Sequence, residues 1–157
     1  MIHGEILFCH ACPHDILFLL VHNKLPVAER LFRTKVRHDP YCDHCIGIQG
    51  AVVADIKHLF CECEQVLTTW KHVRSVIDDL LPGLFNKVLD EELLQLNFPK
   101  TKAEKEIVWI VGQYVQQAWD NILEERGKLS RDKVFGFLKY KYRQEQDQFG
   151  LNIPGLT

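Results

Sequence analysis

Apolar side chains recur at helical spacing along most of this chain, and they almost nowhere alternate as they do in a β-strand. Residues 64–81 give the clearest pattern, with one apolar face that comprises Val66, Leu67, Trp70, Val73, Ile77 and Leu80 or Leu81. Lys102–Arg126 carries a second and broader stripe, made of Ile107, Ile110 or Val111, Tyr114, Val115, Ala118, Trp119 and Ile122. The pattern therefore predicts an all-α fold built around two long helices.

Two shorter helices are predicted before residue 40. Pro13 suits the first turn of a helix over His14–His22, because a proline in that position loses no helical hydrogen bond. Pro26 opens a second helix over residues 27–36, and three of its apolar residues are expected to face inward: Val27, Leu31 and Val36. The first half of the chain is thus expected to be helical up to its cysteine-rich stretch.

The chain after residue 83 is expected to be helical almost to its end. Asp90–Leu96 forms a short piece, and Thr101 with Glu104 has the capping-box spacing that opens the longer helix. Ser130 is placed to cap a last helix over Lys133–Gln144. The final residues, FGLNIPGLT, are expected to form a loose tail.

Composition and charge narrow the class of protein. The 157 residues are 46% hydrophobic and 25% charged, which is typical of a globular chain. Nineteen basic and 21 acidic residues give a net charge of -2, which argues against a protein that mainly coats nucleic acid. The longest apolar run, Ile16–Val21, is too short to span a bilayer, so no membrane association is expected.

Six cysteines occur in three close pairs, which are Cys9 and Cys12, Cys42 and Cys45, and Cys61 and Cys63. The start of the sequence lacks the basic segment and the apolar core of a signal peptide. The cytoplasm or the nucleus is therefore the expected compartment, rather than secretion. Clustered cysteines in a reducing compartment favour metal binding over disulfides.

A four-ligand pattern, C-x2-C-x12-H-x4-C, is formed by Cys42, Cys45, His58 and Cys63. Thiolate and imidazole are the ligands that Zn2+ prefers, in tetrahedral sets of four. Asp55 as an N-cap would place His58 in the first turn of a helix, with the second cysteine pair one turn later. The pattern predicts a structural zinc site, in which Cys61 is an alternative to Cys63.

Cys9 and Cys12 have no complete ligand set of their own. They could form a second site with His10 or His14, or join Cys42 and Cys45 in a four-cysteine site. The simpler interpretation assigns them no metal, because no second ligand pair completes either set.

The segments LPVAERLF, YCDHC and IKHLFCEC, followed by a tryptophan, resemble the zinc-binding region on the C-terminal side of reverse transcriptases from non-LTR retrotransposons. In that family a Leu-Pro-x-x-x-Arg-Leu helix precedes a C-x2-C pair, and a His-Leu-Phe-x-x-Cys segment follows it. The matching positions are Leu25, Pro26, Arg30, Leu31, Cys42, Cys45, His58, Leu59, Phe60, Cys63 and Trp70. The resemblance covers residues 14–75, with a longer loop between Cys45 and His58.

This resemblance implies a ligand set and a role. The last family ligand falls on Cys63, so Cys61 would be an extra cysteine. The family's zinc region is thought to help the polymerase engage template RNA or target DNA. No polymerase or endonuclease domain fits into 157 residues, so the chain resembles a detached C-terminal fragment of such a polyprotein.

Pro82 and Gly83 end the apolar pattern of residues 64–81 and mark a candidate domain boundary. Residues 1–82 are predicted to form a zinc-binding helical domain with its core in residues 14–81, organised by a CCHC zinc knuckle. Residues 83–157 are predicted to form a helical C-terminal subdomain with the loose tail.

Two clusters of basic residues are candidates for binding RNA or DNA. The first comprises Arg30, Arg33, Lys35 and Arg37, and the second comprises Arg131, Lys133, Lys139, Lys141 and Arg143. Four aromatic residues interleave with the second cluster, as they do where bases stack: Phe135, Phe137, Tyr140 and Tyr142. The competing interpretation is that the charges are a solvated face and the aromatic rings are core.

A scaffold without nucleic-acid binding is the alternative function. Acidic residues among large aliphatic ones, at Asp78, Asp79 and Asp90–Glu92, would suit docking to a polymerase or another protein, or pairing of two copies as a dimer. An enzyme is not expected. The pattern of His3, Glu5, Cys42 and Cys45 is only superficially similar to that of zinc deaminases, because Tyr41 interrupts the Pro-Cys pair.

Overall fold

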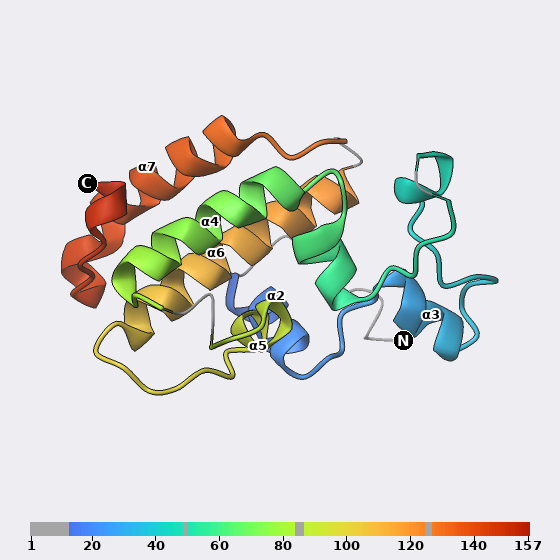
Figure 1. Ribbon diagram of the computed structural model, residues 1–157, viewed down its shortest axis with the longest axis horizontal. Helices are drawn as coiled ribbons and strands as arrows, with labels where there is room; N and C mark the ends of the chain where they lie inside the picture. The colour runs from blue at the N-terminus through green and yellow to red at the C-terminus, as the bar shows by residue number, and fades with distance from the viewer. Residues whose placement is uncertain (1–12, 49, 84–86, 125–126) are drawn as a thin grey trace.

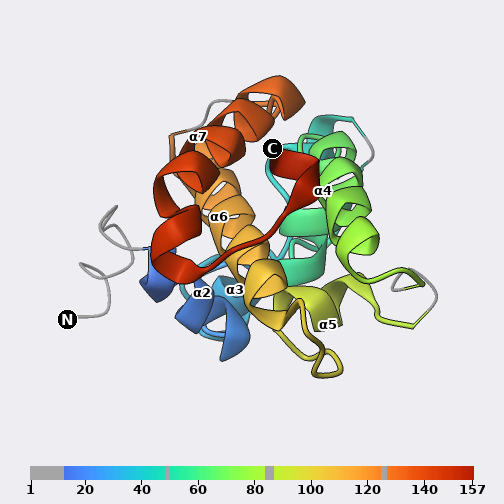
Figure 2. The same cartoon turned by 90° about the vertical axis from the view of Figure 1, so that its left-hand side faces the viewer.

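The computed structural model describes residues 13–48, 50–83, 87–124 and 127–157, and within these ranges the chain forms helices and no β-strand (Figure 1). Three long helices lie side by side: α4 (Leu67–Leu80), α6 (Glu104–Leu123) and α7 (Arg131–Phe149). The short helices α2 (Pro13–Val21) and α5 (Asp90–Leu94) lie below them in this view, and α2 packs against α6 (Figure 2). The all-α prediction is confirmed.

The apolar stripes predicted for the two long helices form the centre of the core. Val66, Trp70, Val73 and Ile77 are buried at or along α4, and the stripe of α6 is buried from Ile107 to Trp119. Ile16 and Leu20 of α2 close the core from the opposite side of α6. The spacing of apolar residues along a helix is a local feature of the sequence. It therefore predicted both α4 and α6 directly.

Helix α3 (Ala28–Arg33) is shorter than residues 27–36, and the inward position expected for Val36 is wrong. Lys35 has a left-handed φ of 63°. Its amide donates to the Phe32 carbonyl at 3.1 Å, and the Val36 amide donates to the Leu31 carbonyl at 2.8 Å. These two bonds satisfy the last carbonyls of the helix and turn the chain outward, which leaves Val36 69% exposed.

The start of α6 and the extent of α7 also differ from the sequence-based helices. The Thr101 hydroxyl accepts from the Ala103 amide at 3.3 Å, and no side-chain cap bonds the first turn of α6, so the predicted capping box is absent. Ser130 does cap α7, since its hydroxyl accepts from the Lys133 amide. That helix continues past Gln144 and ends only at Gly150, which has a left-handed φ of 62°.

The last residues are packed, and the prediction of a loose tail is wrong. Leu151, Ile153 and Leu156 are buried, and the chain ends in a short 3-10 helix, η4 (Pro154–Leu156). The Tyr142 hydroxyl accepts from the Ile153 amide at 3.1 Å and donates to the Leu151 carbonyl at 3.4 Å. The tail therefore covers the end of the bundle and contributes to its core.

One apolar core contains buried residues from both sides of the candidate boundary at residue 82. The division of the chain into two domains stays a prediction, but the halves share this core. α3 and the cysteine-rich loop stand at one end of the molecule, to the right in Figure 1. No described helix is both long and apolar enough to cross a membrane.

Candidate metal centre

Four side chains converge where the cysteine-rich loop meets the start of the α4 segment. Their ligand atoms all lie within 4.8 Å of one another, and all four residues are buried: Cys42, Cys45, His58 and Cys63. The Cys45 sulfur is 3.7 Å from the Cys63 sulfur and 3.5 Å from His58 Nε2. The Cys42 and Cys63 sulfurs are 3.9 Å apart, far beyond the length of a disulfide bond. The predicted set is thus a cluster of free thiols and one imidazole that can hold a metal ion.

The first two ligands are positioned by a short pairing of backbone segments. The Cys42 amide donates to the Val52 carbonyl at 2.8 Å, and the Ala54 amide donates to the Pro40 carbonyl at 2.9 Å. Tyr41 and Val53 form an antiparallel bridge between these bonds. A turn of 3-10 helix, η1 (Cys45–Gly47), then brings the second sulfur back toward the first. The loop between Cys45 and His58 is therefore closed at its base by the backbone.

A π-helical turn, η2 (His58–Glu62), positions the other two ligands. The Cys63 amide donates to the His58 carbonyl at 2.6 Å, which is the i→i+5 bond of a π turn. In an α-helix, residues five apart would point about 140° away from each other, because one turn takes 3.6 residues. The wider turn allows His58 and Cys63 to face the same point. Asp55 caps the segment, as predicted, by accepting from the His58 amide at 2.7 Å.

Cys61 is buried outside the ligand cluster. Its side chain lines a different cavity with Trp70, Arg74 and Asp90, and burial raises the pKa of its thiol. In a regular α-helix Cys61, three residues after His58, would share the histidine's face. In the π turn it is Cys63, and not Cys61, that faces His58. Residue spacing cannot distinguish the two kinds of turn, so it left Cys61 and Cys63 as alternatives.

Two contacts connect the metal centre to residues outside the loop, and no sequence pattern predicts either of them. The Tyr114 hydroxyl on α6 donates to the Phe60 carbonyl at 2.6 Å, within the π turn. His44 Nε2 lies 3.0 Å from Glu64 Oε2, which links the cysteine loop to the segment after Cys63. His44 lies between two ligands in sequence but outside the cluster.

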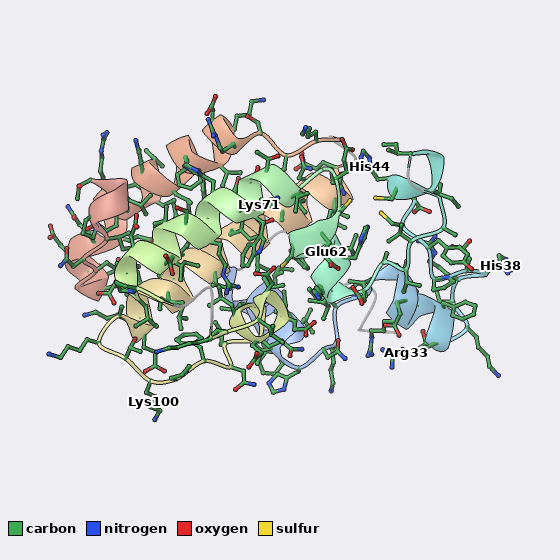
Figure 3. All side chains as sticks on the ribbon, viewed as in Figure 1. Arg33, His38, His44, Glu62, Lys71 and Lys100 are labelled. Atoms are coloured by element: carbon green, nitrogen blue, oxygen red, sulfur yellow. The ribbon has the colours of Figure 1, made fainter. Side chains whose placement is uncertain are left out.

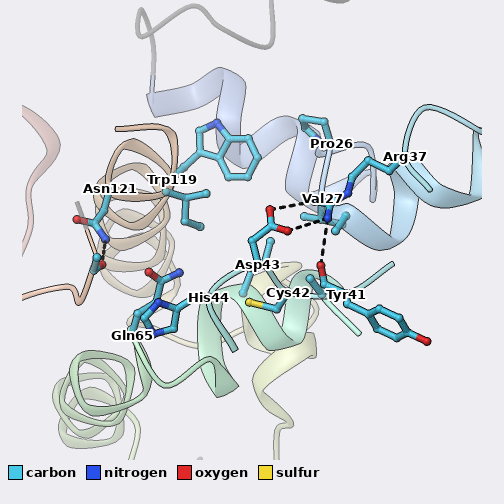
Figure 4. A pocket seen from close by; sticks show the side chains of 15 residues that line it. Pro26, Val27, Arg37, Tyr41, Cys42, Asp43, His44, Gln65, Trp119 and Asn121 are labelled. Carbon is cyan, nitrogen blue, oxygen red and sulfur yellow. Dashed lines mark hydrogen bonds and ion pairs between the residues drawn. The ribbon is translucent and has the colours of Figure 1, made fainter. Parts of the chain in front are cut away.

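Arg37 braces the same loop from the α3 side. Its guanidinium donates to Asp43 at 2.9 and 3.3 Å, to Asp39 at 3.3 Å and to the Tyr41 carbonyl at 3.4 Å. The hydrogen bond that Arg37 donates to Asp43 raises the pKa of the guanidinium. Figure 4 shows this network. It pairs the positive charge of Arg37, which the sequence pattern had indicated as a candidate phosphate contact.

A cavity of about 360 Å³ separates this loop from α6. Figure 4 shows Trp119 on one side of it and Asp43 with Arg37 on the other. Asn121 also lines it, but its amide is occupied by a 2.7 Å bond to the Gly127 carbonyl. The metal loop thus faces α6 across a small, partly polar space.

The three thiols of the cluster do not ionise alike. Hydrogen bonds from Cys63 and His58 lower the pKa of the Cys42 thiol, although burial opposes this. The bond to Cys42, together with burial, raises the pKa of Cys63, and burial raises the pKa of Cys45. Within the protein alone, ionisation of Cys42 is therefore favoured over that of Cys45 and Cys63.

The two basic clusters lie on different parts of the molecule. α3 is at one end, where Figure 3 labels Arg33, whereas α7 runs along the top of the bundle (Figures 1 and 3). Arg33 forms a 2.6 Å ion pair with Glu29, and Arg30 lies 3.4 Å from the Asn23 carbonyl. Lys35 is exposed at the end of α3. The clusters do not form one continuous surface, and their role in nucleic-acid binding stays a prediction.

On α7 the interleaved aromatic residues separate into two groups. Tyr142 is buried, Phe137 is half-buried, and Phe135 packs edge-on against His72 of α4 with ring centroids 4.3 Å apart. Tyr140 is 57% exposed. Tyr142 and Phe135 therefore serve packing, and Tyr140 faces solvent.

Several sequence candidates lie outside the described residues. They are the possible second metal pair Cys9 and Cys12, and the deaminase-like His3 and Glu5.

No protein-family model matches the chain, and no curated protein or solved structure has significant similarity to it. The resemblance to the retrotransposon reverse-transcriptase region thus stays a prediction from the motif residues alone.

Proposed function

We propose that the chain is a non-catalytic zinc-binding module that engages RNA or DNA through α7. The distances between the ligand atoms support the zinc-binding part of this proposal. With Zn–S bonds of about 2.3 Å and a Zn–N bond of about 2.0–2.1 Å, a tetrahedral site has S···S edges of about 3.8 Å and an S···N edge of about 3.5–3.6 Å. The cluster has S···S distances of 3.7 and 3.9 Å and an S···N distance of 3.5 Å. These three distances match a tetrahedral zinc site, and all the ligand atoms lie within 4.8 Å of one another.

The donor set also argues for a structural role of the metal. Three sulfurs and one imidazole nitrogen fill all four positions of a tetrahedral zinc, so none remains for a reacting water or substrate. All four ligand residues are buried. Their chemistry suits a fixed cross-link between the loop and the α4 segment.

Helix α7 carries the nucleic-acid part of the proposal. Lys133, Lys139 and Arg143 are exposed, and within the described part of the chain no acidic group lies within ion-pair distance of them. By contrast, Arg33 and Arg37 near the metal loop are ion-paired. Unpaired cations on one helix are the groups that phosphates contact. The motif resemblance to the reverse-transcriptase zinc region adds independent support.

The test is a salt titration of RNA and DNA binding by the zinc-loaded protein. The double variant Lys139→Glu/Arg143→Glu should bind more weakly and should lower the slope of log affinity against log salt by about 2, one for each lost phosphate contact. Lys100→Glu/Lys102→Glu makes the same charge change at exposed sites on the loop before α6 and should change binding little. Figure 3 labels Lys100, which lies on the opposite side of the bundle from α7. Equal effects of both variants would contradict an α7 interface.

A zinc-stabilised interaction scaffold is the second candidate, and one observation favours it. Apolar residues are exposed on the metal loop and the adjoining α3, namely Phe32, Val36, Ile46, Ile48 and Val53. Exposed apolar groups gathered on one lobe suit a protein contact or a dimer. A dimer in solution, without any salt-dependent binding of RNA or DNA, would support this candidate over the first.

A further inference from the structure

The exposed face of α7 combines cations with a single aromatic ring. Lys133, Gly136, Lys139, Tyr140 and Arg143 are all exposed, and their spacing of three and four residues places them on one side of the helix. Tyr140 is 57% exposed, while Tyr142 and Val134 point into the core. The Tyr140 ring is therefore free of the packing that fixes Tyr142 and Phe135.

Gly136 leaves space where the Tyr140 ring leans. Side chains on a helix tilt toward its N-terminus, so the Tyr140 ring is directed over the preceding turn, where Gly136 lies four residues earlier. A Cβ atom added at Gly136 would meet nothing within 4 Å. One face of the ring thus has no side chain of its own helix against it.

We infer that this face of α7 holds single-stranded nucleic acid, with an unpaired base stacked on Tyr140 in the space above Gly136. Arg143, three residues after Tyr140, lies next to it on the same face, and Lys139 precedes Arg143 by one turn, so both cations can contact the phosphates of a strand whose base stacks on the ring. A duplex offers phosphates to the same cations but keeps its bases paired, so it gains nothing from the ring. This inference rests on the proposed function, because it specifies the strand that the α7 cations would bind.

The experiment measures the affinity of zinc-loaded protein for a short polyuridine strand and for a duplex RNA of the same length at low salt. The wild-type chain should prefer the single strand. Tyr140→Ala should weaken single-strand binding roughly tenfold and leave duplex binding unchanged, because stacking is lost while the charges stay. Tyr140→Phe keeps the ring and should keep the affinity.

A second variant tests the space beside the ring without removing the ring or a charge. Gly136→Leu places a bulky side chain under Tyr140 and should weaken single-strand binding as Tyr140→Ala does. It replaces a helix-interior glycine in open surroundings, so the helix should be stabilised and a folding defect is not the cause of any loss. Gly136→Ala, with its single methyl group, should bind the strand more tightly than Gly136→Leu does.

The outcomes distinguish a failure of the stacking inference from a failure of the proposed function. Equal binding of strand and duplex, unchanged in Tyr140→Ala and Gly136→Leu, would overturn the stacking inference and leave phosphate binding by α7 standing. Binding of neither nucleic acid at low salt would overturn the proposed function itself, and the inference with it.

Discussion

Tyr114 on α6 donates a 2.6 Å hydrogen bond to the carbonyl oxygen of Phe60, in the middle of the π turn that carries His58 and Cys63. Both groups are buried, and burial raises the pKa of the tyrosine well above its usual value, so the hydroxyl stays protonated as a donor. A residue of the second half of the chain thus fixes the backbone between two ligands of the first half. The metal centre is therefore supported by the bundle core as well as by its own loop.

Tyr114→Phe should destabilise the protein by about 1–3 kcal/mol, because it leaves a buried carbonyl without a donor. It should also weaken zinc affinity, since the backbone between His58 and Cys63 loses its support. Chemical denaturation and a competition assay with a chromophoric chelator measure the two effects. Tyr140→Phe removes the same hydroxyl from an exposed ring and should change neither.

Cys63→Ala should abolish zinc binding, whereas Cys61→Ala should leave one zinc per chain. Both thiols are buried, but only the first belongs to the cluster. Loss of the Cys61 sulfur should cost about 1 kcal/mol of stability through packing alone. Metal analysis of the purified variants separates the two cases. Loss of zinc in Cys61→Ala with retention in Cys63→Ala would show that the π turn does not choose the ligand.

Removal of the metal by a strong chelator should open residues 40–63 far more than α6 and α7. The assembly of a structural zinc site contributes roughly 10–16 kcal/mol, and the loop has little regular structure to replace it. The long helices keep an apolar core of their own. Amide hydrogen exchange should rise sharply in the loop and at the start of α4. Unchanged exchange after complete metal removal would show that the loop is held by packing instead.

Ile153→Ala should destabilise the protein by about 2–5 kcal/mol, because the side chain is fully buried against the bundle. Asn152→Ala changes the neighbouring exposed residue and should have almost no effect. Urea unfolding of both variants compares them directly. Equal free energies of unfolding in the two variants would contradict a packed tail and support the loose tail predicted from the sequence.

The parts of the fold that the sequence predicted are those set by local rules. Trp70 and Tyr114 lie on apolar stripes whose period is a property of the helix itself. Ser130 and Asp55 cap the segments that follow them because their side chains reach nearby amides. The ligand spacing was likewise visible, since four residues of the right chemistry are rare in so short a stretch.

The parts that the sequence missed depend on distant or competing contacts. The tail is short, contains two glycines and a proline and has no helical apolar period, so only its packing against the bundle end shows that Ile153 is buried. Arg37 looked like a phosphate contact, but Asp43, on the other side of the loop, binds it. Cys63, rather than Cys61, joins the ligand cluster because of the π turn, and residue propensities do not predict such a turn. The tail packs against segments far away in sequence, whereas the Arg37–Asp43 pair and the π turn are local features that residue spacing alone does not predict.

X-ray absorption at the zinc edge of the purified protein tests the proposed centre most directly. Three sulfur neighbours at about 2.3 Å and one nitrogen neighbour at about 2.0–2.1 Å are the expected shell for Cys42, Cys45, Cys63 and His58. A shell of four sulfurs would exclude His58 as a ligand. A shell dominated by oxygen, or the absence of zinc, would contradict the centre altogether.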